Sequence, residues 1–154
     1  MATRDNNLPY AQFNFQVDFD KGDAITAKAG FQEISGIGME VGVAEYRTGN
    51  APTNNVTKIT GLNKSSDVTL KRGVIGALDL YGWLDDVRSG NRGTRSVTIQ
   101  LRTETAGSQT PVLTWKLNEA RIIKYTCGPL NAKSNEIAME ELVLAYERLT
   151  MDDK

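Results

Sequence analysis

The sequence predicts a mainly β fold, in which two packed antiparallel sheets form a barrel-like sandwich with one flanking α-helix. Several short segments alternate apolar and polar side chains, which is the period of a half-buried strand. Clusters of Gly, Asn, Asp and Pro separate these segments. One segment, from Ala77 to Val87, has clear helical spacing. The 154 residues are typical of a single domain, residues 1–154, that buries its own core.

The N-terminal strands are defined by alternation. Residues 12–20 read QFNFQVDFD, with Phe or Val at every second position, and a turn is expected at 20–23. Extended structure resumes over 27–35. Glycines at both ends of 36–38 break or bulge the strand, which continues over 39–46.

Residues 47–66 are predicted to be a long polar interaction loop. Compact domains seldom contain a structureless loop of roughly 15 residues or more unless it is functional or disordered. Its large apolar residues are Val56, Ile59 and Leu62. Two interpretations stay open at this point: a loop without fixed structure, or an arm whose apolar side chains are buried against a neighbouring molecule.

The helix is expected to be amphipathic and roughly twelve residues long. Leu80, Leu84 and Val87 share one face with Trp83 beside them, and Asp79 and Asp86 lie on the opposite side. An arginine in the last turn and a following glycine are typical of a helix end. We therefore expect the apolar face, with its tryptophan, to pack on the core.

The C-terminal half contains further strands. Alternating segments lie at 67–72, 96–102 and 112–118, and a turn at 105–109 joins the second and third as a hairpin. A further strand is expected over 120–127. Residues 136–149 fit a helix by propensity but also fit a strand that is apolar on both faces. The residue pattern alone favours the helix.

The composition argues against several function classes. Lys and Arg total 18 and Asp and Glu total 19, a near balance that gives no footprint for nucleic acid and permits self-association. Histidine, the commonest general base and metal ligand, is absent. The single cysteine, Cys127, is expected to be a small buried residue. Neither a signal peptide nor a membrane span is expected, so we predict assembly in the cytoplasm.

The polar faces of the strands allow two interpretations. They can face bulk water, as in many antiparallel sheets, or they can line a water-filled channel built by several copies. The acidic residues Glu136, Glu140, Glu141 and Glu147 have no partner base, so we expect a solvated or inter-subunit face. No catalytic, cofactor or metal site is predicted. The alternative function is a small monomeric β-barrel that binds a ligand, and an enzyme ranks third.

A series of motifs, in order, resembles the tail tube family of contractile phages and related contractile injection systems. The first is FQEISGIGMEVGVAEYRTG, which begins at Phe31. The next are GLNKSSDVTLKRGV and LYGWLDDVRSG. The C-terminal half adds W-x-L-N-x-A, K-Y-x-x-G-P-L-N-A and S-N-E-I-A-M-E-x-L-x-L-A-Y-E. The resemblance covers roughly residues 13–149, and Thr60 stands where the family often has proline.

The resemblance implies hexameric rings stacked into a hollow inner tube inside a contractile sheath. It also implies that residues 136–149 form a strand, against their helical propensity. The implied partners are further copies of this chain, the sheath protein, baseplate and tube-terminator proteins, and an effector or DNA as cargo in the lumen. The particle would be a phage tail or a released injection particle, and the subunit would have no cofactor and no enzymatic activity.

The resemblance also assigns expected roles to particular residues. The expected lumen-facing residues are Asp67, Thr69, Lys71, Thr98, Gln100, Arg102, Thr114 and Lys116. The expected contacts between protomers or rings are Tyr46, Arg47, Asn54, Asn55, Val56, Lys58, Ile59 and Leu62, together with the N-terminal segment. The expected sheath contacts are Asp79, Asp85 and Asp86.

Overall fold

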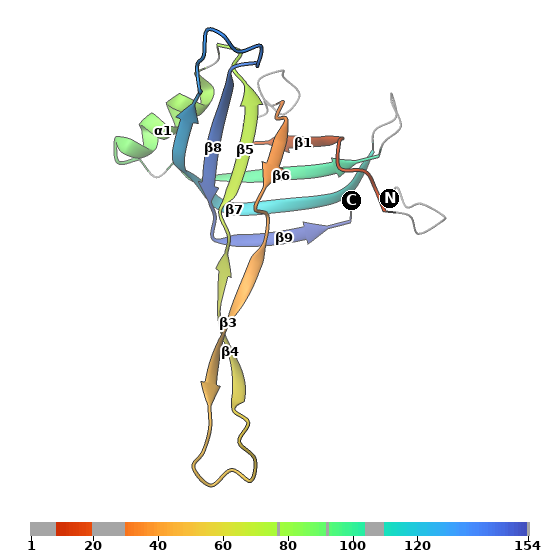
Figure 1. The fold of residues 1–154 in the computed structure, drawn as a ribbon, viewed down its shortest axis with the longest axis vertical. Coiled ribbons are helices and arrows are strands. Elements are labelled where there is room, and N and C mark those ends of the chain that lie inside the picture. The colour runs from red at the N-terminus through yellow and green to blue at the C-terminus, as the bar shows by residue number, and fades with distance from the viewer. Residues whose placement is uncertain (1–8, 20–29, 77, 92, 104–109, 154) are drawn as a thin grey trace.

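The computed structural model describes residues 9–19, 30–76, 78–91, 93–103 and 110–153. Nine strands and one helix are assigned in these ranges (Figure 1). They are β1 Phe15–Asp18, β2 Glu33–Ser35, β3 Met39–Tyr46, β4 Thr57–Ser65, β5 Val68–Gly73, α1 Asp79–Arg88, β6 Arg95–Arg102, β7 Pro111–Cys127, β8 Met139–Ala145 and β9 Arg148–Asp152. Some of the expected elements lie outside the described part. They are the turns at 20–23 and 105–109, residues 27–29, Ala77 and the first eight residues.

Two antiparallel sheets share the long strand β7. The first sheet has the order β1-β6-β7-β9, and the second has the order β7-β8-β5-β2. In Figure 1 the strands of the first sheet run across the picture and those of the second run along it. The strand changes sheets near Glu119, whose φ of 55° lies in the left-handed region. The sheets form an open sandwich, which confirms the fold class and corrects its barrel-like closure.

The core lies between the inner faces of the two sheets. Alternate residues of β5, β6 and β8 are fully buried, as the period of two requires. Val68, Leu70 and Leu117 are completely inaccessible, whereas Trp115 is half-buried. Alternation therefore predicted the inner faces of both sheets.

The helix α1 closes one end of the sandwich. Leu80 and Trp83 are buried, and Leu84 and Val87 pack against the same cluster. The Phe19 and Trp83 rings pack in a T-shaped arrangement, with their centroids 5.7 Å apart. The helix ends at Arg88, before a glycine with positive φ, as the sequence predicted.

The segment 47–66 is not the long loop that we expected. Residues 57–65 form β4, which pairs with β3 in a two-stranded hairpin, and only residues 47–56 connect the two strands. Thr57, Ile59 and Thr60 favour extended structure. The usual alternation is missing because almost every residue of both strands is exposed, so neither face carries an apolar core pattern.

The C-terminal segment is extended, as the resemblance implied. It forms two strands rather than one, because the chain turns at Tyr146 and Glu147 to pass from β8 in the second sheet to β9 in the first. Tertiary packing of Leu142 and Leu144 in the core overrides their helical propensity. Cys127, expected to be buried, is exposed at the end of β7.

Candidate functional site

The outer face of the first sheet carries polar side chains from all four strands. Facing pairs in neighbouring strands form two rows across it. One row contains Gln16, Gln100, Thr114 and Asp152, and the other contains Asp18, Thr98, Lys116 and Thr150. Four of the expected lumen residues therefore belong to this face, but Thr114 is only 7% exposed, so the accessible ones are Thr98, Gln100 and Lys116.

The other expected lumen residues lie elsewhere. Thr69 and Lys71 are on the outer face of the second sheet, where Lys71 lies 4.0 Å from the carboxylates of both Glu33 and Glu141. Asp67 precedes β5, and Arg102 is half-buried at the end of β6. The eight residues therefore do not form one surface, because the strands that carry them belong to different sheets.

The hairpin of β3 and β4 projects from the body of the protein (Figure 1). Its apolar side chains are accessible: Val43 is 54% exposed, Ile59 is 52% and Leu62 is 89%. The eight individual residues expected to contact other protomers or rings lie on this hairpin, in β3, in its connection or in β4, whereas the first eight residues of the N-terminal segment lie outside the described part. In the connection, the Arg47 guanidinium donates to the carbonyl oxygen of Thr53 at 3.2 Å.

The base of the hairpin is fixed to the sandwich by hydrogen bonds. The Tyr146 hydroxyl donates to the carbonyl oxygen of Gly38 at 2.8 Å and accepts from its amide at 3.2 Å. The Ser65 hydroxyl donates to the carbonyl oxygen of Tyr146. The Ser66 hydroxyl bonds the carbonyl oxygen of Gly36, whose φ is +90° and whose position leaves no room for a Cβ against Asp67. These contacts set the direction in which the hairpin leaves the body.

A buried ion network links the helix to the second sheet. Arg72, 1% exposed, donates from both terminal nitrogens to the carboxylate of Asp79, at 2.6 Å and 3.3 Å. Its Nε donates to Glu140, which also accepts from the Tyr125 hydroxyl. The guanidinium lies 5.6 Å from the centre of the Phe31 ring. This arrangement gives the buried arginine bidentate and charge-assisted partners.

The network shifts the ionisation of its members. Burial opposes the charged form of Asp79, but the hydrogen bonds and charge of Arg72 outweigh it and hold the pKa of Asp79 below its usual value. Burial, reinforced by the Glu140 carboxylate, raises the pKa of Tyr125. Both shifts favour the ion-paired form of the network at neutral pH.

We did not predict this ion network from the sequence, although the strand pattern contained a signal for it. Arg72 continues the inward positions of Val68 and Leu70 along β5. Glu140 holds the corresponding place in β8, two residues before buried Leu142, and it is not part of a solvated acidic face as expected. A charged residue at an inward position on each of two paired strands indicates a buried ion pair.

The expected sheath contacts occupy two different environments on α1. Asp79 faces the buried Arg72, which corrects its expected place on the solvent side of the helix. Asp85 is exposed and pairs with Arg88 at 2.6 Å, and Asp86 is also exposed. Only the last two are therefore available to a partner without breaking the network.

The described residues contain no group of three or more His, Cys, Asp or Glu side chains placed to hold a metal ion. Within the same ranges, no helix is long and apolar enough to cross a membrane.

Comparison with known proteins identifies sequence and structural relatives. The sequence model described as T4-like virus tail tube protein gp19 matches residues 11–150. No curated protein matches the chain by sequence. The sequence comparison therefore identifies one family over nearly the full length of the chain.

Solved structures from contractile injection systems resemble the whole chain. A chain of the PVC extracellular contractile injection system sheath–tube complex in its extended state is 25% identical, with a TM-score of 0.82 over 99% of this chain and 100% of that one. A chain from the PVC sheath/tube terminator is 29% identical, with a TM-score of 0.79 over 94% and 97%. Hcp1 from Flavobacterium johnsoniae shares the fold at 11% identity and a TM-score of 0.52, over 91% and 95%.

Proposed function

The chain belongs to the T4-like virus tail tube protein family, and we propose that it builds the inner tube of a contractile injection apparatus from stacked rings of six copies. It is a structural component, and its work is assembly rather than chemistry. Because the chain belongs to this family, we no longer favour the alternative function, a small monomeric β-barrel that binds a ligand.

One observation carries the ring proposal: the first sheet has a polar outer face and ends in β1 on one side and β9 on the other. In the described part of the chain, β6 is the strand that pairs with β1, and β7 is the strand that pairs with β9. Edge strands favour association with other chains, and a closed ring joins them. Pairing β9 of each copy with β1 of the next would join six four-stranded sheets into a barrel. A barrel of that many strands is wide enough to leave an aqueous channel.

The outer face of the first sheet would then line the lumen. Thr98, Gln100 and Lys116 would line it together with Gln16, Asp18, Thr150 and Asp152, and Thr114, which is 7% exposed, would lie beneath them. The mixture of amide, hydroxyl and opposite charges binds no single class of cargo strongly, so an effector or DNA would pass without being held. Thr69 and Lys71 lie on the second sheet and would face away from the channel.

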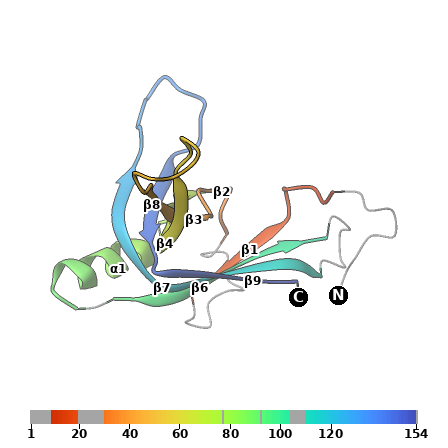
Figure 2. The ribbon, with the colours of Figure 1, turned by 90° about the horizontal axis from the view of Figure 1, so that it is seen from below.

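The opposite side of the subunit would face the sheath. In Figure 2, the connection between β7 and β8, residues 128–138, projects farthest from the first sheet. It exposes Leu130 (82%) and Ile137 (78%). We infer that this connection, with Asp85 and Asp86 of α1, contacts a contractile sheath. Relatives solved in a sheath–tube complex and a sheath/tube terminator support such partners. A baseplate-derived relative supports a baseplate partner, and we propose assembly in a bacterial cytoplasm.

Cysteine accessibility tests which face lines the lumen. In a Cys127→Ser background, Lys116→Cys reports on the first sheet and Lys71→Cys on the second. Both thiols should react with a bulky maleimide in the monomer, whereas only the thiol at position 71 should react quickly in tubes. Equal reaction at both positions in tubes would contradict this assignment. A wild-type protein that stays monomeric at high concentration, with neither rings nor tubes by negative-stain microscopy, would contradict tube formation itself.

A further inference from the structure

The connection between β5 and α1, residues 74–78, exposes apolar side chains. Among its described residues, Val74 is 42% exposed, Ile75 is 55% and Leu78 is 75%. Gly76 turns the chain between them with a φ of +78°, in the left-handed region that favours glycine. Exposed apolar side chains that gather on one short segment indicate a surface that another protein covers.

A buried ion pair joins the two ends of this connection. Arg72, two residues before it, donates to both carboxylate oxygens of Asp79, the first residue of α1, at 2.6 Å and 3.3 Å. The Arg72 side chain is 1% exposed, and its Nε donates to Glu140 of β8. A bidentate pair fixes direction as well as distance. The start of α1 is therefore held in place relative to both β5 and β8.

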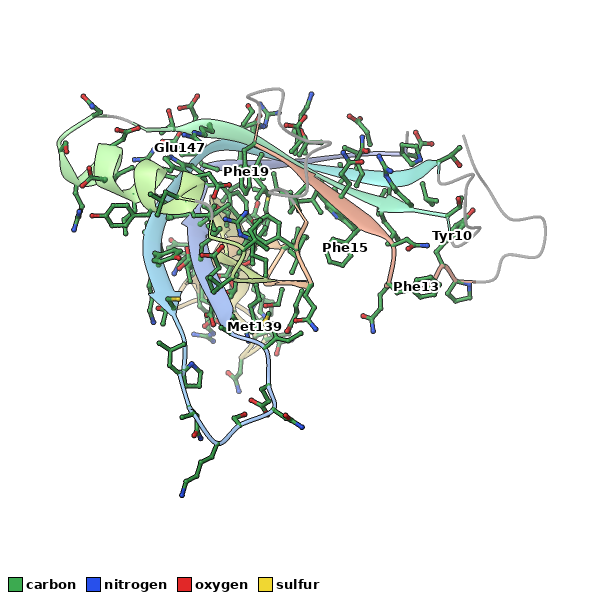
Figure 3. The ribbon with its side chains drawn as sticks, turned by 90° about the horizontal axis from the view of Figure 1, so that it is seen from above. Tyr10, Phe13, Phe15, Phe19, Met139 and Glu147 are labelled. Carbon is green, nitrogen blue, oxygen red and sulfur yellow. The ribbon has the colours of Figure 1, made fainter. Side chains whose placement is uncertain are left out.

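The β5–α1 connection lies beside the β7–β8 connection, residues 128–138. The Val74 amide donates to the carbonyl oxygen of Ala138 at 2.9 Å. Gly73, the last residue of β5, pairs with Met139, the first residue of β8. Figure 1 shows β5 and the β7–β8 connection reaching the end of the second sheet that lies opposite the β3–β4 hairpin. Figure 3 shows Met139 at the base of the β7–β8 connection.

The two connections therefore present one apolar surface. Ile137 is 78% exposed, and its side chain lies 3.6 Å from the place of a Cβ on Gly73. Val74 and Ile75 follow Gly73 directly, so apolar side chains of both connections are exposed at the same edge. This surface continues the one that we infer to contact the sheath, because the β7–β8 connection belongs to both. That continuity favours the sheath protein, rather than another copy of this chain, as the protein that covers it.

The ion pair gives Asp79 a role other than the direct sheath contact that we expected. Its carboxylate is bound to the buried Arg72, whereas Asp85 and Asp86 on the same helix are exposed. Loss of the Asp79 charge would release one end of the connection but leave the core covered. Asp79 is therefore placed to affect a partner through the position of the connection, without touching that partner.

We propose that the β5–α1 connection, through Val74, Ile75 and Leu78, is an apolar docking surface for the sheath protein, and that Arg72 and Asp79 are positioning residues that hold it beside the β7–β8 connection. This inference rests on the proposed function. It adds an apolar contact to the charged ones on α1, and it assigns the connection to sheath binding rather than to tube assembly.

The first test changes the surface without changing the ion pair. Ile75→Asp places a charge on the connection, and Ile123→Asp places the same charge on β7 at a matched isoleucine that is 50% exposed. Both variants should form tubes like the wild type by negative-stain microscopy. In co-sedimentation with purified sheath protein from the same particle, Ile75→Asp tubes should bind about tenfold more weakly, whereas Ile123→Asp tubes should bind normally.

The second test asks whether Asp79 acts through the connection. Asp79→Asn removes the charge but leaves Arg72 its bond to Glu140, so the protein should stay folded. Its tubes should bind the sheath protein about threefold more weakly, and the Val74 amide should exchange its hydrogen faster because its bond to Ala138 opens more often. Leu144→Val, a core change outside the ion network, is the control for lost stability and should leave sheath binding unchanged.

Combining the two changes gives the decisive result. In an Ile75→Asp background, Asp79→Asn should cause no further loss of sheath binding, because the surface that it positions is already disabled. A further threefold loss would mean that Asp79 touches the sheath directly and would overturn its positioning role. Normal sheath binding by Ile75→Asp tubes, or failure of Ile75→Asp alone to form tubes, would overturn the docking surface. If wild-type protein forms no tubes, the proposed function fails first.

Discussion

The sandwich and the hairpin are built from similar residues but reach opposite levels of burial. Val68, Leu70 and Leu144 of the sandwich are completely inaccessible, whereas Val43 and Leu62 of the hairpin are half or more exposed. Both regions are antiparallel β-structure with β-branched and aliphatic side chains. The difference is where the covering surface comes from: the sandwich finds it in its own chain, and we infer that the hairpin finds it in another copy. Folding and assembly therefore use separate surfaces in one protein.

The buried ion network gives the largest predicted effect on the sandwich. Arg72→Met removes a buried cation and leaves Glu140 without its charged partner, which should lower the free energy of unfolding by about 3–5 kcal/mol. Lys71→Met is the matched control on the next residue: its two ion pairs are at 4.0 Å and partly exposed, so its effect should stay below about 1 kcal/mol. Urea unfolding of the unassembled protein measures both, and equal losses would contradict a special role for the network.

Two leucines test the comparison directly. Leu70→Ala opens a cavity in the core and should cost about 2–5 kcal/mol of monomer stability. Leu62→Ala removes the same atoms from a side chain that is 89% exposed, so the monomer should change by less than about 0.5 kcal/mol. Chemical unfolding at low concentration compares the two. A large loss at Leu62 would mean that the hairpin is already packed within a single copy.

The sequence predicted the sandwich far better than the hairpin, for a physical reason. Strands with one buried face show alternation, which correctly located β5, β6 and the first half of β7. The strand β4 has no buried face in its own chain, so Gly61 and the surrounding Asn and Lys were interpreted as loop. The paired inward charges were present in the pattern, but Glu140 was assigned to a solvated or inter-subunit face and Arg72 was given no role. The passage from β8 to β9 at Tyr146 depends on contacts between distant segments, which periodicity does not encode.

One glycine at the junction between the sandwich and the hairpin should be sensitive to substitution. A Cβ at Gly36 would lie 2.3 Å from the carbonyl oxygen of Asp67, and its φ of +90° is unfavourable for any other residue. Gly36→Ala should therefore cost roughly 1–3 kcal/mol and disturb the direction of the hairpin. Gly49→Ala, in the hairpin connection with open space around it, is the control and should be nearly neutral. A neutral result at position 36 would show that the junction does not fix the hairpin.

The smallest predicted effect is on the pH dependence of the free energy of unfolding, and it comes from the sandwich alone. The pKa of Asp79 is held below its usual value, so its contribution to stability is complete above about pH 4 and is lost as the pH falls through the folded-state pKa. The contribution should be less than about 1 kcal/mol, because 38% of the side chain is exposed to screening by solvent. Between pH 5 and 3, the unfolding free energy of wild-type protein should fall more steeply than that of Asp79→Asn, which cannot ionise there. Parallel slopes for the two proteins would show that another carboxylate carries the acid sensitivity.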